Sequence, residues 1–202
     1  TDRYPLFYTG PGADPEPPVV ENDNTPAIPT TDDTFTFSGV FEDNLGLVEV
    51  NVQYSYDDNI YQNESMDKTR GEAYSFSIII EADATDLYYR FYLKDMGRNH
   101  VLTESTKLNV LDNDPPELID DETLDKATTS DMFVFSVKLR DNVGIVSASV
   151  HYSFNGNDYY DKVLVKGMGN TYSVSMTIPE NATVLYYYIA YSDGTNDEET
   201  SI

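Results

Sequence analysis

The stretch FEDNLGLVEVNVQYSY, residues 41–56, is followed by a close copy of itself, LRDNVGIVSASVHYSF, at residues 139–154. When the chain is aligned with itself at this separation of 98 residues, residues 35–95 match residues 133–193 without a gap, and about 24 of the 61 aligned pairs are identical. Each copy is too long to be a solenoid repeat and has the length of an independent domain. The sequence therefore indicates a tandem duplication of one domain.

Within each copy, apolar and polar residues alternate with a period of two. The segment VEVNVQYSY places Val48, Val50, Val52, Tyr54 and Tyr56 on one face and polar residues on the other. This alternation is typical of half-buried strands, and clusters of Asp, Asn and Gly interrupt it at regular spacing. No segment shows the periodicity of an amphipathic helix. We therefore predict an all-β chain with about seven short strands in each copy, arranged as a β-sandwich, with a closed barrel as the alternative.

Three motifs recur in the same order in both copies. A proline pair opens each copy, a D-N-x-G turn precedes a V-x-Y-S strand, and an L-Y-Y strand ends in Asp95 or Asp193. In this order the motifs resemble the immunoglobulin-like and fibronectin type III-like modules of microbial surface proteins. The resemblance implies two tandem immunoglobulin-like β-sandwiches, at residues 17–111 and 112–202. Residues 101–111 have no counterpart in the second copy, so we expect the last strand of that domain to be truncated.

Residues 1–16 belong to neither copy. Seven of the ten prolines fall within the first thirty residues, which is typical of a semi-extended linker. The first eight residues, TDRYPLFY, resemble the tail that closes right-handed β-helix domains in archaeal and bacterial surface proteins. This resemblance implies that the chain is a fragment of an archaeal surface protein, with a β-helix domain upstream of the linker.

The composition excludes several classes of partner. The formal net charge is −24, from 36 acidic and 12 basic residues, so the surface repels nucleic acid phosphates and anionic lipids. No apolar run approaches the roughly 18 residues of a membrane span, and we expect no direct membrane insertion. The chain has no cysteine, so disulfides and thiolate–metal chemistry are absent. The negative charge suits divalent cations, although solubility alone would also account for it.

We predict that the protein is not an enzyme. It contains two histidines, His100 and His151, and the position of His151 is taken by Gln53 in the first copy. A general base would not normally be replaced by glutamine in a sister copy. The chain has no G-x-S-x-G or H-E-x-x-H motif and no phosphate-binding glycine loop.

Acidic loops suggest that calcium is a possible cofactor. In an immunoglobulin-like sandwich, the entry segment, the turn between the second and third strands and the turn after the sixth strand lie at the same end, so acids from three segments should converge at the domain junction. Oxygen ligands from separate loops are what calcium uses. The predicted ligands are Asp14, Glu16, Asp43, Asn44 and Asp95 in the first copy and Asp112, Asp114, Asp141, Asn142 and Asp193 in the second.

The sequence DNDP before the second copy also resembles the calcium-binding linkers of cadherins. The alternative interpretation is structural, because Asp and Asn side chains favour turns by bonding to the local backbone.

Outward side chains and sequons supply further candidate sites. Ligand binding, to carbohydrate or to a protein, is predicted for Tyr88, Arg90, Tyr92, Tyr186 and Tyr188. The alternative is that these residues form ordinary cross-strand pairs. The sequons at Asn63 and Asn181 fall in predicted turns and are candidate glycosylation sites.

Together these features predict a non-catalytic spacer or adhesion segment of an extracellular surface protein, stiffened by calcium at the domain junction. The alternative function is an accessory module whose outward tyrosines hold polysaccharide for the upstream β-helix domain. The expected partners are other surface proteins or polysaccharide, and the expected location is the cell surface.

Overall fold

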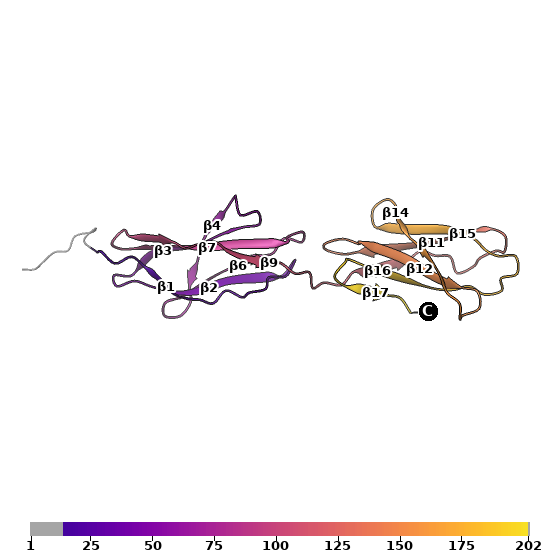
Figure 1. Ribbon diagram of the computed structural model, residues 1–202, viewed down its shortest axis with the longest axis horizontal. Coiled ribbons are helices and arrows are strands. Elements are labelled where there is room, and N and C mark those ends of the chain that lie inside the picture. The colour runs from indigo at the N-terminus through magenta and orange to yellow at the C-terminus, as the bar shows by residue number, and fades with distance from the viewer. Residues whose placement is uncertain (1–13, 202) are drawn as a thin grey trace, which may run out of the picture. The chain divides into compact units, whose positions relative to one another are not determined.

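The computed structural model describes residues 14–201 and divides the chain into two compact units, Thr1–Leu111 and Asp112–Ile202 (Figure 1). Both units are built from β-strands, which confirms the all-β prediction. The described residues contain no helix that could cross a membrane. The TDRYPLFY segment and most of the predicted linker lie outside the described residues.

The first unit is a sandwich of two antiparallel sheets. One sheet has the order β1-β2-β6-β5; the other has the order β4-β3-β7-β8, and β9 also pairs with β7. The strands are β1 (Val19–Asp23), β2 (Thr34–Glu42), β3 (Leu47–Ser55), β4 (Gln62–Ser65), β5 (Asp67–Lys68), β6 (Ala73–Ile79), β7 (Asp86–Asp95), β8 (His100–Leu102) and β9 (Thr106–Asn109).

The second unit repeats this arrangement with one strand fewer among the described residues. Its sheets have the orders β10-β11-β15-β14 and β13-β12-β16-β17. The strands are β10 (Glu117–Asp121), β11 (Met132–Arg140), β12 (Ser147–Ser153), β13 (Tyr160–Val163), β14 (Val165–Lys166), β15 (Thr171–Thr177), β16 (Tyr186–Ser192) and β17 (Asp197–Glu199).

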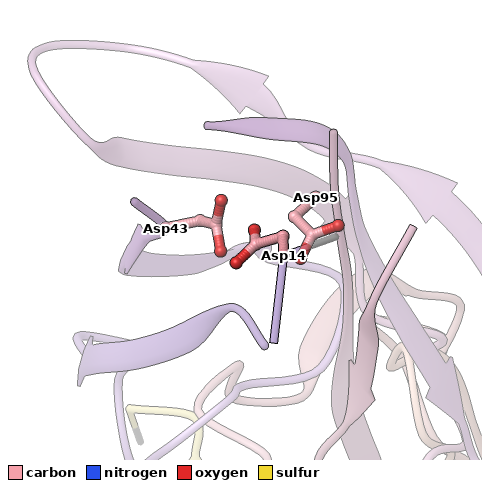
Figure 2. Close-up of side chains that lie close together, drawn as sticks. All are labelled: Asp14, Asp43 and Asp95. Atoms are coloured by element: carbon pink, nitrogen blue, oxygen red, sulfur yellow. The ribbon is translucent and has the colours of Figure 1, made fainter. Parts of the chain in front are cut away.

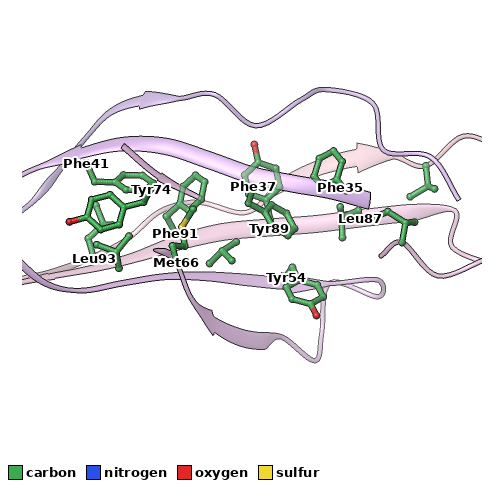
Figure 3. Packing of buried hydrophobic residues seen from close by; sticks show 14 residues of the cluster. Phe35, Phe37, Phe41, Tyr54, Met66, Tyr74, Leu87, Tyr89, Phe91 and Leu93 are labelled. Atoms are coloured by element: carbon green, nitrogen blue, oxygen red, sulfur yellow. The ribbon is translucent and has the colours of Figure 1, made fainter. Parts of the chain in front are cut away.

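The core of the first unit lies between its two sheets and is rich in aromatic rings (Figure 3). Alternate residues of β2 and β7 point into it, as the period of two predicts. Phe37 is central, because its ring lies 5.3 Å from Phe35, 5.7 Å from Tyr54 and 5.4 Å from Tyr89, measured between ring centroids. Burial of these large apolar surfaces is the main stabilising contribution to each unit.

The predicted alternation is wrong at the start of β3. Val48 was expected to share the buried face with Val50, but its side chain is 56% exposed. The pairing of β3 with β7 shifts register between Leu47 and Glu49, and a β-bulge of this kind moves a side chain to the other face. Leu47 packs against the core instead.

The two cores differ in the side chains of one pair of neighbouring core positions in strands β2 and β11. Gly39 and Phe41 of the first unit correspond in the repeat to Val137 and Leu139 of the second. A Cβ atom on Gly39 would lie 2.4 Å from Cζ of Phe41, so the phenyl ring fills the space that a side chain at position 39 would need. The second unit fills the same space with the side chain of Val137, which is fully buried.

A tyrosine–aspartate hydrogen bond links the two sheets in each unit. The hydroxyl of Tyr89 in β7 donates to Asp23 of β1 over 2.7 Å, and the hydroxyl of Tyr187 in β16 donates to Asp121 of β10 over 2.8 Å. Burial raises the pKa of both tyrosines, and the hydrogen bond to the nearby carboxylate raises it further, to about 12.

These hydrogen bonds predict a loss of stability at alkaline pH. Because the pKa of each tyrosine is raised above its ordinary value of about 10, its contribution is fully present below pH 10 and is lost as the pH rises from about 10 towards 12. We expect Tyr89→Phe to reduce the free energy of unfolding by about 1 to 2 kcal/mol at pH 7 and to lose less than the parent at pH 11. Urea unfolding at both pH values measures this, with Tyr92→Phe as control; equal alkaline losses in the parent and Tyr89→Phe would contradict it.

Candidate metal centres

Three aspartates from separate segments of the first unit converge at one end of the sandwich (Figure 2). Asp14 lies in the entry segment, Asp43 in the turn between β2 and β3, and Asp95 at the end of β7. One carboxylate oxygen of each lies within 4.8 Å of the corresponding oxygens of the other two. The side chain of Asp95 is buried, and those of Asp14 and Asp43 are half-buried.

Asp43 uses one carboxylate oxygen to form its turn. Its Oδ1 accepts a hydrogen bond of 2.8 Å from the amide of Leu45, and its carbonyl accepts one of 3.3 Å from Gly46, whose φ of +93° favours glycine. Its other oxygen, Oδ2, is buried and receives no hydrogen bond from residues 14–201. Asp43 therefore forms the turn with Oδ1, and its Oδ2 remains for the cluster.

Asp14 is held against the same turns. Its Oδ1 accepts hydrogen bonds from Asn44 Nδ2 (3.3 Å) and the amide of Glu16 (3.1 Å). Its Oδ2 is buried and receives no hydrogen bond from the described part of the chain. A Cβ atom on Gly97 would lie 2.6 Å from Cβ of Asp14, so a glycine there permits the close approach. Although the sequence assigned residues 14–16 to the linker, they pack on the first unit.

Asn99 is a member of this site that the sequence analysis missed. Its amide and its side-chain nitrogen each donate to Asp95 over 2.8 Å, and the side chain also donates to the carbonyls of Asp14 and Glu16. Asn196 takes the same place in the second unit, where it donates to Asp193 and to the carbonyl of Asp114. The recurrence of an asparagine shortly after Asp95 and Asp193 could have identified this member of the site. The loop before it is one residue shorter in the second copy, so the alignment of the two copies without gaps does not match Asn99 with Asn196.

The second unit repeats the cluster with Asp112, Asp141 and Asp193, whose carboxylate oxygens also lie within 4.8 Å of one another. Oδ1 of Asp141 accepts from the amides of Val143 (2.9 Å) and Gly144 (2.6 Å), and its buried Oδ2 receives no hydrogen bond from residues 14–201. Asp141, like Asp43, therefore forms its turn with Oδ1 and directs Oδ2 to the cluster.

Asp193 is held in its charged form. Its burial acts to raise its pKa, but the hydrogen bonds that Asn196 and the amide of Thr195 donate together lower the pKa below its ordinary value. The carboxylate that closes the second cluster is thus ionised at neutral pH.

Four further predicted ligands lie beside the two trios: Glu16, Asn44, Asp114 and Asn142. Glu16 is exposed and contributes its carbonyl, which accepts from Asn99. Asn44 directs its amide nitrogen at Asp14, and Asn142 directs its amide nitrogen at Asp112 and Asp114. In this arrangement the amide nitrogens of the two asparagines hold the carboxylates in place, and ligation of a cation would fall to their carbonyl oxygens.

The donor set fits a hard cation. Each trio offers carboxylate oxygens alone, with no imidazole or thiolate ligand, and this chemistry suits calcium better than zinc or copper. The buried oxygens of Asp14, Asp43 and Asp141 that receive no hydrogen bond from the described residues give an independent reason to expect a ligand, because buried polar atoms are normally satisfied.

The predicted ligand-binding residues on the outer face of β7 contact neighbouring side chains. The guanidinium of Arg90 lies 4.1 Å from the centroid of the Tyr61 ring, and Tyr88 lies beneath the amino group of Lys107. The ring of Tyr92 lies 6.0 Å from that of His100. Of these contacts, Tyr88 with Lys107 is a directly opposed cross-strand pair, and ligand binding at this face stays a prediction.

The outer face of β16 is more open. The ring of Tyr188 stacks on that of His151 at 4.7 Å, whereas the side chain of Tyr186 is 40% exposed. The sequon residue Asn181 lies in a turn as predicted. Asn63 does not, because it lies in β4, where its side-chain oxygen accepts from Gln53 over 3.1 Å.

Comparison with known proteins bears on the fold. No family model matches the chain, and no curated protein matches it. Among solved structures, the titin I-band fragment I67-I69 is 13% identical, with a TM-score of 0.54 over 91% of this chain and 63% of that chain. The fold is a tandem of immunoglobulin-like β-sandwiches.

Two further solved structures are similar to this chain at lower TM-scores. The titin fragment A168169 is 10% identical with a TM-score of 0.49, over 90% of this chain and 94% of that chain. A tetra-tandem repeat from the extending region of a large adhesion protein is 14% identical with a TM-score of 0.43, over 85% of this chain and 45% of that chain.

Proposed function

We propose that this tandem is a non-catalytic spacer segment of an extracellular surface protein, and that each immunoglobulin-like unit binds a calcium ion at its aspartate trio. The observation that carries the proposal is the repetition of the trio, with buried carboxylate oxygens in both units that receive no hydrogen bond from residues 14–201. The partners of such a segment would be neighbouring surface proteins or polysaccharide.

Physical chemistry supports a cation at each trio. Three carboxylates with oxygens within 4.8 Å of one another repel each other, and burial strengthens this repulsion because water screens it less. A buried oxygen with no donor adds a desolvation cost. A divalent cation removes both costs, and calcium accepts oxygens from separate loops in a flexible geometry.

The position of the second trio connects calcium to stiffness. Asp112 follows directly on Leu111, the last residue of the first unit, and lies in the segment that leads into β10. An ion shared with Asp141 and Asp193 would fix this segment to two turns of the second unit. Extracellular modules bind calcium at about 10⁻⁴ to 10⁻³ M, which suits a spacer that is stiffened only outside the cell.

A thermal melt of the chain in EDTA and in millimolar calcium tests the proposal. We expect calcium to raise the free energy of unfolding by about 0.5 to 1.5 kcal/mol for each site through mass action, which corresponds to about 2 to 10 °C in midpoint for domains of this size. Magnesium should have little effect, because it demands near-octahedral geometry and gives up its water reluctantly. Identical curves in EDTA and calcium would exclude the site.

Asp43→Asn is the decisive variant for the first unit. Asparagine keeps the Oδ1 acceptor that forms the turn with Leu45 and replaces the negatively charged Oδ2 side of the carboxylate with a neutral amide group. We expect it to melt higher than the parent in EDTA and to lose the calcium response of the first unit. Glu16→Gln, outside the trio, should keep that response, and loss of response in both variants would point to a general charge effect.

A further inference from the structure

The outer face of β7 carries tyrosines and cations in alternation. Every second side chain of this strand is half-buried and faces outward, and the outward series includes Tyr88, Arg90, Tyr92 and Lys94. Residues on one face of a strand follow each other at about 7 Å. β7 pairs with β3 along one edge and with β8 and β9 along the other. A ligand on this face would therefore meet ring surfaces and charged tips rather than a backbone edge.

Arg90 is held in a fixed position on this face. Its Nε donates to the side-chain oxygen of Gln53 over 2.8 Å, and its guanidinium lies 4.1 Å from the centroid of the Tyr61 ring. Within residues 14–201 it forms no ion pair with a carboxylate. A guanidinium that is oriented in this way is prepared to bind an acidic group from a ligand.

Two acidic residues on this face have partners of their own. Asp86 forms an ion pair of 3.0 Å with Lys107. Glu49 of β3 lies opposite Lys94, but its Oε1 accepts a hydrogen bond of 2.9 Å from Asn51. In the part of the chain that the structure describes, Lys94 forms no ion pair. Its charge therefore remains for a ligand.

The second unit has no cation at the equivalent positions. Tyr188 and Ser192 stand in place of Arg90 and Lys94. Strand β17 adds acidic residues beside them, because residues 197 and 199 pair with residues 192 and 190. The two units have the same strand order, so the fold does not require cations on this face. The basic and aromatic face is specific to the first unit, in a chain with 36 acidic and only 12 basic residues.

We propose that the outer face of β7 binds an acidic polysaccharide. The carboxylate or sulfate groups of the polysaccharide pair with Arg90 and Lys94, and its sugar rings stack on Tyr88 and Tyr92. Such acidic groups match the planar donor fork of a guanidinium, and a tyrosine ring offers an apolar face with a polar tip. The proposal assigns one face and one chemistry to the polysaccharide partner named above, and it does not depend on calcium.

The surroundings of the face favour a polysaccharide over other acidic polymers. An extended peptide gains affinity from hydrogen bonds to a free strand edge, whereas β7 is paired along both edges. A nucleic acid carries a phosphate at every nucleotide, and the net charge of −24 opposes its approach. The screening length at physiological ionic strength is about 8 Å, so a ligand with spaced acidic groups responds mainly to the cations beside it.

An NMR titration of the chain with an oligogalacturonate, in EDTA at physiological salt, tests the proposal. EDTA removes calcium from the protein and from the sugar, so the result is separate from that of the calcium proposal. We expect shift changes on the outer face of β3 and β7, and none on the corresponding face of β12 and β16. A sulfated oligosaccharide shows which acidic group the face prefers, and a neutral galactose oligomer should not bind.

Substitutions that copy the second unit test the face without threatening the fold. Tyr92→Ala and Lys94→Ser introduce the residues found at positions 190 and 192 and should each weaken binding about five- to tenfold. Arg70→Met introduces the residue found at position 168 and removes a positive charge between β5 and β6, on the other sheet. It should change the affinity less than about twofold.

Four results would overturn the proposal. The first is that neither acidic sugar shifts the outer face of β7, and the second is that the neutral oligomer binds as well as the acidic ones. The third is that Arg70→Met weakens binding as much as Lys94→Ser, because the effect would then come from net charge alone. The fourth is tighter binding of oligoglutamate or of a single-stranded oligonucleotide, which would assign the face to another class of partner.

Discussion

A Gly39→Val variant is expected to lose about 3 kcal/mol of stability in its first unit, although valine is the native residue at the equivalent position, Val137. A Cβ atom at position 39 would lie 2.4 Å from Cζ of Phe41 and 3.1 Å from the carbonyl oxygen of Asn22. Phe41 is fully buried and its ring lies 4.9 Å from that of Phe91, so it has little room to move away. Overpacking of a well-packed core typically costs about 1 to 3 kcal/mol and sometimes more.

The double variant Gly39→Val/Phe41→Leu should recover about 2 kcal/mol of that loss. It recreates the pair Val137 and Leu139 of the second unit, in which the larger side chain at the first position occupies the space of the missing ring. A double-mutant cycle from urea unfolding measures the coupling, and the second unit serves as an unchanged reference. A double variant no more stable than Gly39→Val would show that the ring and the glycine are not a matched pair.

The matched substitutions Leu87→Ala and Leu185→Ala are expected to differ by about 2 kcal/mol in their effects. Leu87 is fully buried beneath β9, so its truncation leaves a cavity and should cost about 3 to 4 kcal/mol. Leu185 is half-buried at a groove lined by residues 124–129 and 182–185, where water already reaches part of the side chain, and its truncation should cost about 1 to 2 kcal/mol.

Chemical unfolding followed by residue-specific NMR separates the two units and measures both losses. Equal costs for the two variants would mean that Leu185 is as well covered as Leu87, which would contradict the difference in burial between the two side chains.

Much of the fold could be predicted because its signals are local. The alternation of Phe35, Phe37 and Phe41 identifies a core strand, and the repetition of that pattern identifies a second copy. The prediction for Val48 was wrong because the register shift at Leu47 depends on pairing with a distant strand.

The candidate site could be predicted only in part. The convergence of Asp14, Asp43 and Asp95 follows from which turns share an end of a sandwich. The role of Asn99 could not be derived in this way, because it depends on a loop that brings one side chain to two carbonyls far away in sequence. The direction of the Asn44 amide likewise depends on where Asp14 is held.

The acidic surface has a consequence for the solution behaviour of the chain. The net charge of −24 keeps identical chains apart at low ionic strength. Salt shortens the screening length to about 8 Å at physiological ionic strength and to about 3 Å at 1 M. The acidic surface thus keeps identical chains apart in solution, and this repulsion weakens as the ionic strength rises.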